Sequence, residues 1–117
     1  MKKNKKNNSF TIKAKPLSVN MVWAGRRFKT PAYKKYETEI SYLLPKKLDI
    51  PEGDLEINIT WGMSSSMSDI DNPTKPFLDI LQKQYGFNDK QIFRLNLIKE
   101  KVKKGEDFIK CEILSLK

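Results

Sequence analysis

The sequence contains no histidine and a single cysteine, Cys111, among its 117 residues. Without histidine, the Ser-His and Cys-His nucleophilic mechanisms lack their general base and are excluded. Structural zinc sites are built mainly from cysteine and histidine, so such a site is nearly excluded as well. A lone cysteine cannot form an internal disulfide. Because Cys111 lies in an alternating apolar run, we expect a buried core residue in a reducing cytoplasm.

Long hydrophobic runs are also absent. No apolar run approaches the ~20 residues of a membrane helix, and no apolar segment follows the first lysines as it would in a signal peptide. The hydrophobic content of 38% is low but compatible with a globular domain. The lysine-rich first residues, MKKNKKNN, are typical of a mobile tail. We therefore predict a flexible basic tail over residues 1–8 and one domain over residues 9–117.

Acidic residues are scarce in the first part of the chain. Residues 1–47 carry a net charge of +11, whereas residues 48–117 carry −2, which together give the overall +9. This asymmetry predicts that the first part of the chain binds a polyanion and that the second part carries the acidic residues. A generally basic, solvated surface is the alternative interpretation.

The hydrophobic periodicity predicts six elements. Alternating apolar residues indicate strands, apolar residues at helical spacing indicate helices, and residues 17–29 are expected to form a loop. Thr30-Pro31 is a typical helix start, and Gly86 is a typical helix stop. The predicted ranges are a strand over 10–14, a helix over 30–45, a strand over 55–63, a helix over 72–85, and strands over 92–102 and 108–116.

The predicted order β-α-β-α-β-β favours an α+β fold, a single domain with a mixed sheet and helices packed on it. The strand-helix-strand unit over residues 55–102 is expected to form a right-handed parallel crossover. The last two strands are joined by Lys103-Lys104-Gly105-Glu106-Asp107, which predicts an antiparallel hairpin.

The richest chemical pattern is an acidic set around the second helix. Asp69 and Asp71 precede it, Lys75 lies in its first turn, and Asp89 follows it. Carboxylates at i and i+2 face the same side of an extended segment, and three of them would suit Mg²⁺, with Mn²⁺ as a substitute. Lys75 would stabilise a pentavalent phosphate or orient a water molecule. The set predicts metal-assisted phosphodiester cleavage, provided that the two connections converge.

A purely structural interpretation of the same residues stays open. Asp71 or Asn72 would cap the helix, and Asp89 would be a turn residue. Lys75 would pair with Asp79, and Asp79 with Lys83, as ordinary i,i+4 contacts on a helix face.

The ordered set of motifs resembles the RusA-type Holliday junction resolvases, a family of small phage- and prophage-associated endodeoxyribonucleases. The resemblance covers residues 10 to 114 and centres on Asp69-Ile70-Asp71-Asn72-Pro73-x-Lys75, followed by Asn88-Asp89-Lys90-Gln91-Ile92. The upstream Pro16-Leu17-Ser18-Val19-Asn20 is similar to the family's opening. The chain departs from the pattern at Asn88, where some members have a second acid, and its loop before Asp89 looks short.

The resemblance implies a role for each motif residue. Asp69, Asp71 and Asp89 would be the metal-linked catalytic carboxylates, and Lys75 the catalytic lysine. The implied activity is Mg²⁺-dependent paired nicking of four-way DNA junctions in recombination and repair. The implied protein is a homodimer in a bacterial or phage-encoded setting, cytoplasmic and associated with the nucleoid. A two-fold symmetric junction that needs two matched cuts also favours a dimer on physical grounds.

Cations interleaved with aromatic residues predict the DNA-contacting surface. Trp23 or Phe28 would stack on exposed bases, or else pack on the sheet. Asn20 is predicted to bind DNA, and phosphate contacts are predicted for the cations Arg26, Arg27, Lys29, Lys34 and Lys35. In the alternative interpretation, Lys34 and Lys35 form a solvated helix face. The competing functional hypothesis is a noncatalytic nucleic-acid-binding module whose acids serve only as caps and turn residues.

Overall fold

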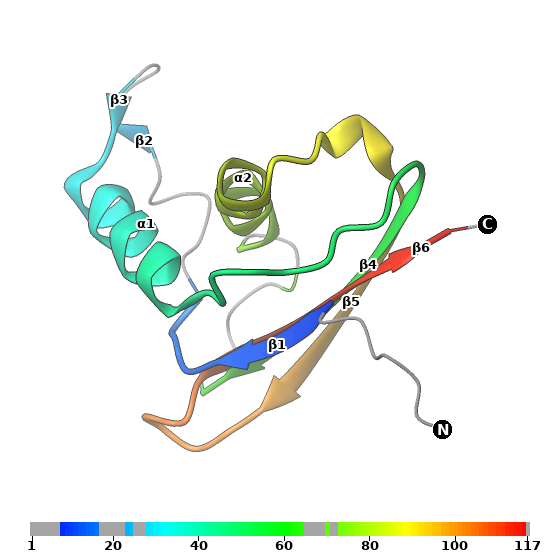
Figure 1. Ribbon diagram of the computed structural model, residues 1–117. Coiled ribbons are helices and arrows are strands. Elements are labelled where there is room, and N and C mark those ends of the chain that lie inside the picture. Colours follow the sequence, from blue (N-terminus) through cyan, green and yellow to red (C-terminus); the bar gives the residue numbers. More distant parts are fainter. Residues whose placement is uncertain (1–7, 17–22, 25–27, 65–69, 71–72, 117) are drawn as a thin grey trace.

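The computed structural model describes residues 8–16, 23–24, 28–64, 70 and 73–116. It confirms an α+β domain in which a four-stranded mixed sheet carries two helices on one face (Figure 1). The elements are β1 (Ser9–Ile12), β2 (Trp23–Ala24), β3 (Phe28–Lys29), α1 (Pro31–Leu43), β4 (Leu55–Met63), α2 (Thr74–Tyr85), the 3-10 turn η2 (Asp89–Gln91), β5 (Ile92–Lys101) and β6 (Phe108–Ser115).

Strand β4 is a central strand of the sheet, which has the order β1-β6-β4-β5. Its residues alternate between a buried face and a half-buried face as far as Trp61, as the sequence pattern predicts. The buried face packs against the helices, and the ring centroids of Trp61 and Phe77 of α2 lie 5.4 Å apart. Cys111 of β6 is fully buried in the same core, as expected, and burial raises the pKa of its thiol to about 12.

The predicted parallel crossover is confirmed. Strands β4 and β5 precede and follow α2 in sequence, and they pair with each other in parallel. The predicted hairpin of the last two strands is wrong. Strand β6 pairs antiparallel with β4 on one side and with β1 on the other, so β4 lies between β5 and β6. The connection over residues 102–107 has enough length to cross the roughly 10 Å that two strand spacings require.

Gly62 allows the crossing connection to return close to β4. A Cβ atom at this position would overlap the ring of Phe108, the first residue of β6. The absence of a side chain therefore lets Phe108 lie directly against the β4 backbone.

Helix α1 begins and ends as its sequence predicts. The hydroxyl of Thr30 accepts a hydrogen bond from the amide of Tyr33 at 3.1 Å, and Pro31 is the first helical residue. Among the apolar residues that recur at helical spacing in this segment, Leu43 does not face the core, because it is 42% exposed. The others are buried: Tyr33, Tyr36, Ile40 and Leu44.

Helix α2 also matches its predicted end. Gly86 adopts φ 78°, a left-handed conformation that favours glycine, and its amide bonds to the carbonyl of Gln82. Phe77, Leu78 and Leu81 form its buried side, as predicted.

The segment predicted as a loop over residues 17–29 contains two short strands. The backbones of β2 and β3 pair antiparallel, Trp23 with Lys29 and Ala24 with Phe28. Residues 1–7 of the predicted tail lie outside the described residues. No helix in the described ranges is long and apolar enough to cross a membrane.

Candidate functional site

One face of α2 carries a row of polar side chains. The ammonium of Lys75 lies 2.8 Å from the Asp79 carboxylate, one helical turn away, and both side chains are accessible to solvent. Gln82 follows at the next turn, at i+7 from Lys75, and is half-buried. Lys83 contacts Glu37 of α1 at 2.6 Å and not Asp79, so only the first of the two proposed i,i+4 pairs is observed.

Asp89 is attached to this face by a hydrogen bond from its backbone. Its amide donates to Oε1 of Gln82 at 3.0 Å, which brings the segment after α2 back along the helix. Asn88 caps the 3-10 turn, because its side chain accepts from the amide of Lys90 at 2.8 Å. In return, the amide of Asn88 donates to the Gln91 side chain at 3.0 Å. Asn88 therefore makes the cap, and the Asp89 carboxylate is exposed at the first position of the turn.

Lys75 and Asp89 act on each other electrostatically. The pKa of Lys75 is raised above its ordinary value, chiefly by its hydrogen bond to Asp79 and further by the negative charges of Asp79 and Asp89. Desolvation opposes this rise. Lys75 stays protonated at neutral pH, as a group that meets a phosphate must. Two residues that flank α2 at opposite ends in sequence thus contribute to one polar surface.

The first two acids of the predicted set, Asp69 and Asp71, lie outside the described residues. Two hydrogen bonds are seen among the described residues nearest to them in sequence. The amide of Ser64 donates to Oδ2 of Asp107 at 3.3 Å, and the hydroxyl of Thr74 donates to the carbonyl of Ile70 at 3.3 Å. The half-buried Ile70 side chain packs against the core.

Within the described part of the chain, no three acidic or cysteine side chains come together to hold a metal. The carboxylate of Asp79 is occupied by Lys75, whereas the exposed Asp89 carboxylate takes part in no hydrogen bond or ion pair of the described residues. The hard oxygen donors of the Asp89 carboxylate are therefore accessible to a divalent cation.

The proposed helix cap is only partly described. Pro73 occupies the cap position of α2, and its side chain has no acceptor to offer the first amides. Asn72 and Asp71, the predicted capping residues, lie outside the described residues.

Most of the predicted DNA-contacting side chains cannot be placed. Asn20, Arg26 and Arg27 lie outside the described residues, and only the backbone of Lys29 is described, in β3. Lys34 and Lys35 are exposed on α1 and are accessible to phosphate. Their DNA contacts stay predictions, as does base stacking by Trp23 or Phe28.

Gln82 is the residue of this surface that sequence reasoning missed. Its contact with Asp89 spans seven residues and depends on the direction that the chain takes after Gly86. The available signal is its spacing, since positions 75, 79 and 82 share one helix face.

A family model described as Endodeoxyribonuclease RusA matches residues 4–113, nearly the whole chain. No curated protein matches the chain.

Proposed function

The chain belongs to the RusA endodeoxyribonuclease family, and on that premise we propose that it resolves Holliday junctions by paired, metal-dependent hydrolysis of DNA phosphodiester bonds. Its place would be in DNA recombination and repair, in a bacterial or phage-encoded setting. Asp69, Asp71 and Asp89 would hold the metal, and Lys75 would contact the reacting phosphate.

The observation that supports this proposal is the row of Lys75, Asp79 and Gln82 on one face of α2, to which the backbone of Asp89 is hydrogen-bonded. Neither Lys75 nor Asp89 is buried, and their contribution to packing is small. The hydrogen bond from Asp89 to Gln82 fixes the backbone while leaving the carboxylate accessible. An exposed acid attached to the polar face that also carries a protonated lysine would provide a metal ligand and a phosphate donor on one surface.

Mg²⁺ or Mn²⁺, when bound, would polarise a phosphate oxygen and lower the pKa of a water molecule. The protein's own part would be to hold the carboxylates together and to place the Lys75 ammonium. Lys75 would then stabilise the negative charge that develops on the phosphate oxygens in the transition state.

We propose a homodimer as the active form, with β5 as the pairing edge. Strand β5 pairs with β4 on one side, and it exposes Phe93 to 66%, Ile98 to 54% and Leu95 to 39%. A long open edge with apolar side chains is a template for another strand. A two-fold axis at Leu97 would place Arg94 opposite Glu100 of the partner subunit, which makes the charges complementary.

The direct test uses a labelled synthetic four-way junction with Mg²⁺, and a linear duplex of the same arms. We expect the wild type to cut the junction at paired positions and to leave the duplex intact. Asp71→Asn and Asp89→Asn should each lower cleavage by about 100-fold or more while junction binding persists. Asp54→Asn, which changes an exposed carboxylate in the turn before β4, serves as the matched control and should cut normally.

Binding without cutting in both Mg²⁺ and Mn²⁺ would contradict the nuclease proposal. The same result would favour the noncatalytic binding module, in which Asp71 and Asp89 have only structural roles.

A further inference from the structure

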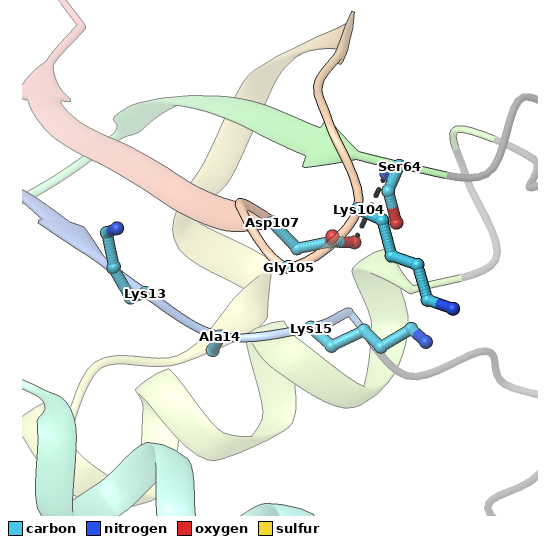
Figure 2. Close-up of a pocket in the computed structure, with 7 residues that line it drawn as sticks. All are labelled: Lys13, Ala14, Lys15, Ser64, Lys104, Gly105 and Asp107. Atoms are coloured by element: carbon cyan, nitrogen blue, oxygen red, sulfur yellow. Dashed lines mark hydrogen bonds between the residues drawn. The ribbon is translucent and has the colours of Figure 1, made fainter.

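A lysine-lined cavity lies at the end of the sheet, apart from the polar face of α2. It has a volume of about 350 Å³ and is formed where the chain leaves β1, where β4 ends and where the connection from β5 to β6 turns (Figure 2). Its charged and hydrogen-bonding side chains are those of Lys13, Lys15, Ser64, Lys104 and Asp107.

The charges of this cavity are unbalanced. The lining includes three lysines and one acid, Asp107, whose carboxylate already accepts a hydrogen bond from the backbone amide of Ser64. In the part of the chain that the structure describes, no ion pair involves Lys13, Lys15 or Lys104. Like charges that line one hollow repel each other, and an anion removes that repulsion.

Two of the lysines are arranged to act together. Figure 2 shows the side chains of Lys15 and Lys104 extended in the same direction, whereas Lys13 points elsewhere. Lys15 follows β1 and Lys104 belongs to the connection between β5 and β6, so the two come from segments far apart in sequence. Two ammonium groups that approach from different segments can bind one phosphate from two sides.

The position of the cavity links it to the acidic motif. Ser64, which lines the cavity, is five residues before Asp69. Five residues span at most about 18 Å, which corresponds to about five nucleotides along one strand of B-form DNA. A DNA strand bound at Asp69 would therefore need at most about five further nucleotides to reach the cavity.

We propose that this cavity binds a backbone phosphate of the DNA substrate, held between the ammonium groups of Lys15 and Lys104. The proposal rests on the proposed function, since it assumes a nucleic-acid substrate. The contact positions the strand and reads no sequence. Asp107 keeps the cavity in shape by tying the end of β4 to the start of β6.

The test measures junction binding without divalent cations, so that cleavage does not interfere. The double variant Lys15→Gln/Lys104→Gln should bind the four-way junction about 10-fold more weakly near 0.1 M salt. The slope of log affinity against log salt concentration should fall by about one. The matched control, Lys46→Gln/Lys110→Gln, removes the same charge from exposed positions elsewhere and should keep the wild-type slope.

Two further measurements make the result decisive. Lys15→Arg/Lys104→Arg should restore binding, and all variants should unfold at the wild-type midpoint. Equal losses in the double variant and its control would overturn the proposal. So would displacement of the junction by millimolar inorganic phosphate at constant ionic strength, which would identify a site for free phosphate.

Failure of this inference can be told apart from failure of the proposed function. If the wild type cuts the junction and the double variant behaves as its control does, only the cavity has been misassigned. If the wild type binds the junction without cutting it while the double variant loses affinity, the nuclease proposal fails and the phosphate site stands.

Discussion

Lys75 stays largely exposed although it forms an ion pair with Asp79, with 64% of its side chain accessible to solvent. An exposed i,i+4 pair stabilises a helix by only about 0.3–0.5 kcal/mol. Because the pKa of Lys75 is raised, the stabilisation by this pair is fully present at neutral pH and is lost only as pH rises through the raised value. The ammonium therefore remains available for a phosphate throughout the neutral range.

Replacing Lys75 should separate catalysis from stability. We expect Lys75→Met to lower junction cleavage by about 100-fold, because a charge that stabilises the transition state is lost. Its free energy of unfolding should change by no more than about 0.5 kcal/mol. Cleavage rates and denaturant unfolding measure the two effects, and between about pH 6 and 9 the wild-type rate should show no loss from Lys75 deprotonation.

Asp79→Asn is the matched control for this residue. It breaks the same ion pair but keeps the Lys75 ammonium, so cleavage should stay within a few-fold of the wild type. A loss as large as that in Lys75→Met would mean that the ion pair, and not the free ammonium, is what matters.

Some of these residue contacts were predictable from the sequence and others were not. The pairing of Lys75 with Asp79 follows from helical spacing alone, and the cap at Thr30 follows from residue type and position. The contact of Asp89 with Gln82 does not, because it depends on where the chain turns after the helix. The placement of Asp69 and Asp71 stays a prediction.

At the scale of elements, the boundaries were predictable but the order of the strands was not. Periodicity located β4, β5 and β6 within one or two residues, since burial of one face dictates the pattern along each strand. Both a hairpin and a crossing connection satisfy that pattern. What distinguishes them is tertiary: β4 is apolar enough to be central, and Gly62 leaves space for Phe108.

Substitution of Gly62 tests this account of the crossing. Gly62→Ala places a methyl group where the Phe108 ring lies, so we expect a loss of about 1–3 kcal/mol in the free energy of unfolding, measured with denaturant. Gly53→Ala is unsuitable as a control, because its φ of 84° would add backbone strain. The double variant Gly62→Ala/Phe108→Leu should recover part of the loss. If Gly62→Ala is neutral, the close packing of Phe108 does not constrain the strand order.

At the scale of the whole molecule, the two helices lie on the same face of the sheet, so parts of the sheet are not covered by helices (Figure 1). In addition, β5 leaves one edge of the sheet open. The lysine cavity lies at one end of the same sheet. The overall charge asymmetry is visible in the sequence, but the assembly of a cavity from three separate segments is not, because it requires the strand order.

The β5 edge predicts the effect of a charge on self-association. In the proposed dimer, Phe93→Lys should raise the dissociation constant by at least 10-fold, because the interface would remove the new charge from water. Sedimentation equilibrium measures this shift. Tyr42→Lys, at a residue of α1 that is 87% exposed, is the matched control and should not alter association. A Phe93→Lys variant that dimerises as the wild type does would exclude β5 as the interface.

The insertion of β6 between β1 and β4 also governs when the domain can form during synthesis. Strand β1 pairs with β6, with Ser9 beside Glu112, so β6 must leave the ribosome before β1 can join the sheet. Strand pairings between residues this far apart in sequence form slowly, and until they form the strand edges remain unpaired. A nascent chain therefore has no complete four-stranded sheet until the residues of β6 have been synthesised and are free to pair.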